Sequence, residues 1–330
     1  MNRAHLDKER GAALLTILLW VAIVGAIAAA ALDRLRLSTK LASNASAVEQ
    51  ARALASGVEQ LLVLAIDDVT ASDTLPRNGD AALLKDERSI QLPLGGHARV
   101  ALRDGGNCFN INSVGEGDDP SRIMRRPTGI AQFQALMVIL GVPAKEARSI
   151  SSAAGDWVDA DTAVEPAGAE DATYAQMKPA YRAGNTLFAD VSELRAVAGM
   201  TAIRFEQLRP WLCALPNTDL SPINLNTLGG EQAPLLAMLA PDQISIARAR
   251  QVLEQRPRGG WTSLSDFYQV PAMRAVVLPG VVQFQPQLRT GWVRGQILIT
   301  YQQAEVSEFI LIDGRAKPAR LIMRQWGDEG

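Results

Sequence analysis

An uncharged apolar run near the N-terminus constrains this chain more than any other feature. The segment "KERGAALLTILLWVAIVGAIAAAALDR" covers residues 8–34, and residues 11–32 within it carry no charge. As a helix this run would be about 33 Å long, which is enough to cross the hydrocarbon core of a bilayer. Arg3, Lys8 and Arg10 precede it, so the positive-inside rule predicts a cytoplasmic N-terminus, with the bulk of the chain outside the cytoplasm.

The helical pattern continues past the apolar run, and no proline interrupts residues 12–66. We predict one helix, with residues 12–34 in lipid and residues 35–66 packed on a soluble domain. A conventional signal peptide cut near Ala30 is the alternative, because "AIAAAA" offers small residues for cleavage. The length of the run and the continuing helix favour an anchor. We expect an apolar stripe to pack against partner helices through Leu37, Leu41, Val48, Val58 and Leu62.

The two ends of the soluble chain read as strands. "SIQLPLGGHARVALRDGGNCFNIN" (89–112) alternates apolar and polar residues around glycine turns, and "GQILITYQQA", "SEFILIDGR" and "ARLIMRQWG" follow the same pattern near the C-terminus. We expect residues 67–113 and 286–330 to form one antiparallel sheet against the long helix, which gives an α+β fold. Residues 114–285 would then be a mostly helical insertion.

The insertion contains a weak internal duplication. "FNINSV" (109–114) resembles "INLNTL" (223–228), and "LFADVSELRAVAGM" (187–200) resembles "GWTSLSDFYQVPAM" (260–273). Each copy predicts a strand end, a helix pair and a capped helix, in the manner of a helix-hairpin-helix unit. Some such units bind DNA, so a membrane-anchored DNA receptor or a minor pilin of a DNA-uptake system is the rival function.

Two observations disfavour the DNA-binding alternative. The hairpin "LAPDQIS" has no glycine for close phosphate approach and would place Asp242 against the phosphate. Lys and Arg total 33 against 35 Asp and Glu, so the chain has no basic excess. The sequence also lacks a nucleophile elbow and an HExxH motif, and we expect a protein that is not an enzyme and binds no nucleic acid.

An acidic loop, residues 155–174, is the strongest candidate site. Six like charges in one folded loop repel unless a cation gathers them, and hard oxygen ligands suit calcium. Val164 stands where an EF-hand needs glycine, so an EF-hand is not supported. A solvated acidic connection is the alternative. The candidate ligands are Asp156, Asp159, Asp161, Glu165, Glu170 and Asp171.

Cys108 and Cys213 are the only cysteines of the chain. Two buried thiols are one interpretation. Because the soluble chain is predicted to lie outside the cytoplasm, we favour a disulfide between them.

The leader and several inner segments resemble a known family. "RGAALLTILLWVAIV" is similar to a type IV prepilin leader, in which residues 1–11 are removed after Gly11 by a prepilin peptidase and Ala12 is N-methylated. The fifth residue after the cut is usually Glu in that family, whereas here it is Thr16. With "GNCFNIN", "DWVDAD", "GAED", "ELRAVAGMT" and "INLNT", almost the whole chain resembles the K-type minor pseudopilin of type II secretion.

The resemblance implies a pseudopilin fold and a single-pass protein of the bacterial inner membrane with its bulk in the periplasm. It implies calcium in the acidic loop. It also implies a complex with the I-type and J-type minor pseudopilins, and contacts with other pseudopilins and the inner-membrane assembly platform. Because Thr16 lacks the usual carboxylate, the resemblance implies a position at the tip of the pseudopilus, where the protein would start and cap assembly.

Overall fold

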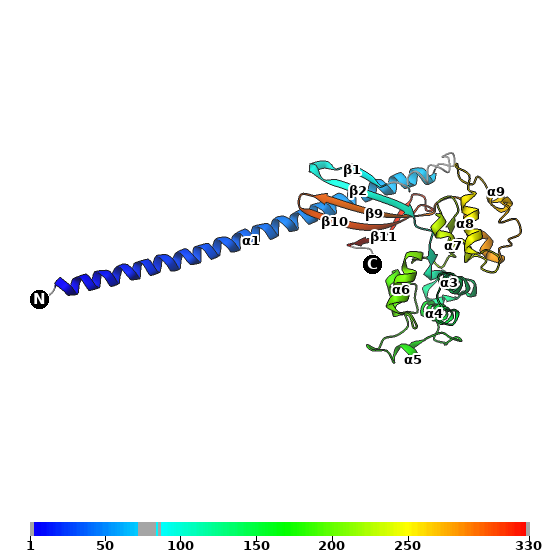
Figure 1. Ribbon diagram of the computed structural model, residues 1–330, viewed down its shortest axis with the longest axis horizontal. Coiled ribbons are helices and arrows are strands. Elements are labelled where there is room, and N and C mark those ends of the chain that lie inside the picture. The colour runs from blue at the N-terminus through cyan, green and yellow to red at the C-terminus, as the bar shows by residue number, and fades with distance from the viewer. Residues whose placement is uncertain (1–2, 72–83, 85–86, 328–330) are drawn as a thin grey trace.

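The computed structural model describes residues 3–71, 84 and 87–327, together with the side chains of α1 from Leu14 to Val69 (Figure 1). Helix α1 (Arg3–Ala71) is continuous over 69 residues, which corresponds to roughly 100 Å. Its side chains from residue 14 to residue 46 are all exposed, and Figure 1 shows this part extending away from the rest of the protein. The predicted single helix is therefore confirmed.

A five-stranded antiparallel sheet joins the two ends of the soluble chain, as predicted. Its strand order is β1-β2-β9-β10-β11, so the N-terminal hairpin pairs with the C-terminal strands through β2 and β9. The bounds are β1 Arg88–Gln91, β2 His97–Asp104, β9 Trp292–Tyr301, β10 Ala304–Asp313 and β11 Arg320–Trp326.

The second half of α1 packs on this sheet (Figure 1). Ala47, Ala51 and Ala55 recur every four residues and are buried, and their small side chains let the helix approach the strands closely. Val58 and Ile66 extend the same buried face toward the end of the helix. The opposing apolar side chains come from the inward face of the sheet, and they include Ala98, Val100, Ile297, Ile299, Ile310 and Ile312.

The chain between β2 and β9 forms a separate, mostly helical region with its own large core. Figure 1 places it beyond the sheet, at the opposite end of the molecule from the N-terminus. Its helices are α3 Pro127–Ile139, α4 Ala144–Val158, α5 Asp171–Tyr174, α6 Ala202–Leu208, α7 Ala233–Ala237, α8 Ile246–Glu254 and α9 Leu264–Gln269. Short strands accompany them, at β3 Phe109–Asn110, β4 Gly115–Glu116, β5 Met124–Arg125, β6 Leu212–Cys213, β7 Ile223–Asn224 and β8 Pro286–Gln287.

The predicted duplication is present in the geometry of two units. In the first unit (β3 to β6), β3 pairs in parallel with β6, and in the second unit (β7 to β8), β7 pairs in parallel with β8. The Asn112 amide receives the Phe188 N–H at 2.7 Å and donates to the Phe188 carbonyl at 2.9 Å. Asn226 does the same with Trp261, at 2.7 and 3.2 Å. The matching asparagines thus hold matching loops.

One strand prediction was too long. The pattern over 89–112 predicted strands to its end, but sheet pairing of β2 stops at Asp104. A side chain on Gly106 would lie 2.9 Å from the Pro222 carbonyl oxygen, so the chain needs glycine where it turns toward the helical region. Phe109 and Asn110 then pair with β6 in the first unit instead of the main sheet.

Candidate functional site

Three carboxylates of the acidic loop lie together between the end of α4 and the start of α5. Asp159 directly follows α4, Glu170 directly precedes α5, and Asp161 lies on the connection. One oxygen from each lies within 4.8 Å of the others. Asp159 and Glu170 are 1% and 2% exposed, whereas Asp161 is exposed. We call these three residues the acidic cluster.

The acidic cluster is electrostatically costly as it stands. The carboxylate oxygens of Asp159 and Glu170 are buried without a hydrogen-bond partner among the described residues. Burial, and then the charges of Asp161 and Glu170, raise the pKa of Asp159 to about 7, although Arg125 opposes the shift. Burial also raises the pKa of Glu170. A divalent cation would offset this cost, and oxygen donors on an irregular loop suit calcium better than magnesium, which needs near-octahedral geometry.

The other three predicted ligands lie outside the acidic cluster. Asp156 is fully buried and pairs with the Arg125 guanidinium, which also donates to Ser152 Oγ at 3.1 Å. Glu165 is exposed. Asp171 accepts a hydrogen bond from the Ala183 N–H at 3.0 Å. The structure thus brings three of the six candidate ligands together and gives Asp156 and Asp171 structural partners.

Asn185 is a neighbour of the acidic cluster that the sequence did not single out. Its backbone adopts a left-handed conformation, with φ of 44°. Its side-chain amide donates to the Asp161 carbonyl at 3.1 Å, while its Oδ1 is buried without a partner among the described residues. Asn185 therefore ties the chain beyond α5 to Asp161. The Gly-Asn pair at 184–185 was a turn signal that could have indicated it.

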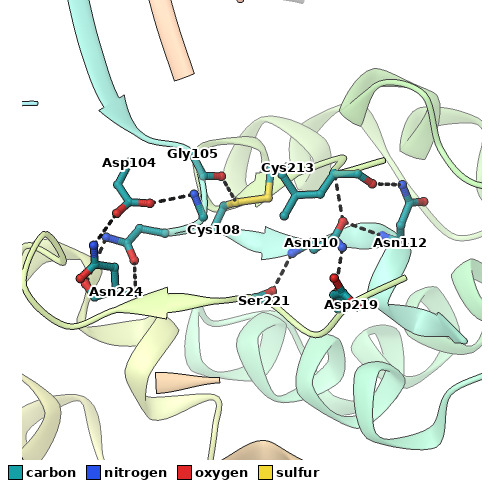
Figure 2. The surroundings of a disulfide bond; sticks show 12 residues. Asp104, Gly105, Cys108, Asn110, Asn112, Cys213, Asp219, Ser221 and Asn224 are labelled. Atoms are coloured by element: carbon teal, nitrogen blue, oxygen red, sulfur yellow. Dashed lines mark hydrogen bonds between the residues drawn. A yellow bond between two sulfur atoms is a disulfide. The ribbon is translucent and has the colours of Figure 1, made fainter. Parts of the chain in front are cut away.

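A disulfide joins the first unit to the end of the sheet. Cys108 and Cys213 are bonded, which confirms the prediction. Figure 2 shows the bond between two sets of polar contacts, one made by Asp104 and Asn224 and the other by Asn110, Ser221 and Asp219. The two cysteines belong to one buried cluster with Leu215, Trp292 and Leu311.

Asp104 links the sheet to the second unit. It is the last residue of β2, and its carboxylate accepts from the Gly106 N–H at 2.9 Å and from Thr227 and Thr290 Oγ1, each at 2.7 Å. Asn224 Nδ2 donates to it at 2.8 Å. Burial raises the pKa of Asp104, and these four hydrogen bonds lower it in part. One carboxylate therefore holds residues that lie more than 100 positions away in sequence.

The residues of the predicted partner stripe lie on one side of α1 but differ in exposure, because the sheet covers only the later part of the helix. Val58 is buried in the core with the sheet, and Val48 and Leu62 pack partly against that core. Leu37 and Leu41 are 59% and 61% exposed. The face opposite the sheet also exposes Ala53, Gly57, Leu61 and Leu64, and we call these four residues the outer face of α1.

The candidate membrane span of α1 is apolar and exposed. Its strongest window has a mean hydropathy of 2.5 and no buried residue, so α1 is long and apolar enough to cross a membrane. Thr16 lies in this exposed part. The side chains at Gly11 and Ala12 lie outside the described residues.

Comparison with known families decides the relationship. Residues 107–217 and 223–285 each match a family model described as type II secretion system protein K. The chain belongs to this protein K family. Protein K of Klebsiella pneumoniae is 34% identical over 81% of each chain, and protein K of Dickeya chrysanthemi is 30% identical over 97% of each chain.

The fold of protein K is also found in a solved structure. A crystal structure of the GspK-GspI-GspJ complex from the type 2 secretion system of enterotoxigenic Escherichia coli matches with a TM-score of 0.71 and 27% identity. The match covers 89% of this chain and 99% of that one. The two family-model matches meet between residues 217 and 223, where the first unit ends and the second begins. The protein is a K-type minor pseudopilin, and pseudopilins are not a known enzyme family.

Proposed function

We propose that this protein lies at the tip of the type II secretion pseudopilus, where it starts and caps assembly for export of folded proteins across the outer membrane. It is anchored in the inner membrane by residues 12–34, after a prepilin peptidase cuts between Gly11 and Ala12. Its bulk lies in the periplasm. It assembles with the I-type and J-type minor pseudopilins, then with other pseudopilins on the inner-membrane platform.

Thr16 carries the proposal for a tip position. A carboxylate buried in lipid is costly unless a positive charge pairs with it, and the N-terminal ammonium of a subunit assembled ahead would supply that charge. Thr16 has no carboxylate to offer such a subunit. A chain with threonine at this depth therefore suits the first position, which has no subunit ahead.

The shape of the protein supports the same position. Figure 1 shows the helical region lying beyond the sheet, at the far end from the membrane segment. A filament built from packed α1 helices leaves little room for such bulk between successive subunits. At the end of the filament, the helical region meets no steric limit.

The outer face of α1 is the surface we propose for a partner helix. Gly57 has no heavy atom within 4 Å of the position of an added Cβ, so its surroundings are open. Ala53 and Gly57 are small and allow close helix approach, and Leu61 and Leu64 supply apolar area beside them, 63% exposed each. These residues continue on the side of α1 that the sheet leaves uncovered.

Co-expression with its own I-type and J-type partners and the prepilin peptidase tests this function. We expect a complex of three subunits, with mass spectrometry finding this chain starting at N-methylated Ala12. A chain that starts near Ala31 would indicate a conventional signal peptide and would refute the assembly proposal. Gly57→Leu combined with Leu61→Glu should weaken the complex at least about tenfold, because close packing at the centre of an interface is lost. Gly230→Leu, at another exposed glycine with open surroundings, is the matched control.

We further propose that the acidic cluster binds calcium as a structural cofactor. The support is the buried position of Asp159 and Glu170, the convergence of three carboxylates, and the lack of a well-formed hydrogen bond to the oxygens of those two residues within the described chain. Calcium would join the end of α4 to the start of α5 and so fix the acidic loop.

Chelation of calcium should destabilise the full-length protein. A ligand that binds only the native state stabilises it by about 2.7 kcal/mol at a hundredfold excess over its Kd, so chelator should lower the melting temperature measured in detergent. Calcium should restore it better than magnesium. The triple variant Asp159→Asn, Asp161→Asn, Glu170→Gln should lose the calcium response. Glu165→Gln, in the same loop but exposed, should keep it. Identical melting temperatures in chelator and in millimolar calcium would show that the acidic cluster does not bind calcium as a structural cofactor.

A further inference from the structure

A second group of charges is buried between α1 and the edge of the sheet. Glu59 on α1 and Glu308 on β10 are both 0% exposed. Arg324 on the edge strand β11 contacts both, with its Nε and Nη2 at 2.6 Å from the two Glu59 oxygens and its Nε at 2.9 Å from Glu308 Oε1. Two carboxylates therefore share one guanidinium.

The negative charges of this buried group outnumber its positive charge. Two ionised carboxylates against one cation leave a net negative charge away from water, which is costly. Burial, and then the Glu59 charge, raise the pKa of Glu308 to about 7, although Arg324 opposes the shift. Near neutral pH the pair of carboxylates therefore holds one proton for part of the time.

Among the described residues, Arg324 is the cation that contacts both carboxylates. On α1, Gln60 donates to Glu59 Oε1 at 3.2 Å, and Arg52 pairs with Glu49 and lies over the Trp326 ring at 5.7 Å from its centroid. The titratable side chain that β9 adds to this core is Tyr301, and β2 adds Ala98, Val100 and Leu102. Asp67, further along α1, accepts from the Ala319 N–H at 2.8 Å.

We propose that Glu59, Glu308 and Arg324 form a proton-dependent latch between α1 and the edge strand β11. With one proton shared by the two carboxylates, Arg324 balances the remaining charge and β11 is held against α1 and β10. When that proton leaves to solvent, the carboxylates repel and the edge strand is held more weakly. The native state loses stability as pH rises toward the raised pKa, because over that range the folded protein keeps a proton that the unfolded chain has already lost.

The latch acts on an edge strand of the sheet. Strand β11 is at the edge of the sheet and pairs with β10, and the bonds of Arg324 to Glu59 add a contact with α1 to that pairing. Opening would free the last strand and uncover part of β10, while β2 and β9 stay paired with each other. The latch would thus couple proton concentration to the exposure of one sheet edge.

Limited trypsin digestion of the full-length protein in detergent, at fixed calcium concentration, tests the latch. Cleavage after Arg320 within β11 is followed by mass spectrometry at pH 5.5 and pH 8.5. At each pH the rate is divided by that of Glu308→Gln, which cancels the pH dependence of the protease. We expect this ratio to rise on the order of tenfold or more between the two pH values, because only the wild type loses a proton at this position.

Glu59→Gln provides the second variant. With one carboxylate removed, Glu308 keeps its burial but loses the repulsion from Glu59 and the competition for Arg324, so cleavage relative to Glu308→Gln should change less between pH 5.5 and pH 8.5 than in the wild type. A wild-type ratio that stays constant over this range would overturn the latch, since a purely structural ion pair predicts that result. So would a pH-dependent ratio that is as large in Glu59→Gln as in the wild type.

Discussion

Replacing Cys108 and Cys213 together by alanine should lower the free energy of unfolding by about 4–5 kcal/mol. The bond closes a loop of 105 residues, and removing it returns that conformational freedom to the unfolded chain. The sulfur atoms are also buried against Leu215, Trp292 and Leu311, so truncation adds a small packing loss. Urea denaturation of the full-length protein, followed by tryptophan fluorescence, measures the effect.

Reduction of the wild type gives an independent comparison. Wild-type protein with a reductant should unfold near the urea concentration that unfolds the double alanine variant in oxidising buffer. If oxidised wild type and the variant unfold together, the cross-link does not constrain the unfolded chain and the prediction is wrong. The disulfide lies where the sheet meets the first unit, so we expect its loss to affect both parts.

The fold was largely predictable because its main elements carry strong local patterns. The apolar run and the uninterrupted helical spacing predicted α1, and alternation at the two ends of the chain predicted the sheet. The similarity of "FNINSV" to "INLNTL" predicted two units, and the structure gives Asn112 and Asn226 the same hydrogen-bonding role. Each of these signals depends on neighbours in sequence, which a sequence displays directly.

The sequence of the acidic loop did not indicate which of its carboxylates lie together in the structure. Six carboxylates looked equivalent in sequence, yet Asp156 is paired with Arg125, which comes from β5. No spacing within the loop indicates that partner. The acidic cluster instead depends on the end of α4 and the start of α5, which place Asp159 and Glu170 side by side. Charge density along the sequence therefore could not separate these three carboxylates from the other three.

For a related reason, the sequence could not separate the part of the α1 stripe that the sheet buries from the part that stays exposed. Apolar residues at helical spacing predict a buried face but do not say what buries it. In the structure the sheet covers Val58, while the outer face of α1 contains Ala53 and Gly57, which have little hydrophobicity to reveal them. The role of Asp104 was also not predicted, because its partners Asn224, Thr227 and Thr290 are distant in sequence.

Replacing Asp104 by alanine should therefore be among the most destabilising single changes in the soluble part. The substitution leaves the Gly106 N–H, the Thr227 and Thr290 hydroxyls and the Asn224 amide without their shared acceptor. An unsatisfied buried donor costs about 1–3 kcal/mol, and the two hydroxyls can rotate toward other acceptors, so we expect a total loss of about 3–5 kcal/mol. Urea denaturation of the full-length protein measures it.

Two further variants separate the hydrogen bonds from the loss of a charge. Asp104→Asn keeps the shape and one acceptor oxygen but turns an NH2 group toward a donor, so it should fall between wild type and Asp104→Ala. Asp118→Ala removes an exposed carboxylate and should change the unfolding free energy by less than about 0.5 kcal/mol. Because Asp104 joins the end of β2 to the second unit, Asp104→Ala should also speed hydrogen exchange at the Asn224 amide, which is bonded to Asn107, more than in β9. Equal stability of Asp104→Ala and Asp118→Ala would mean that water replaces this carboxylate without cost, and that the sheet and second unit are held by packing alone.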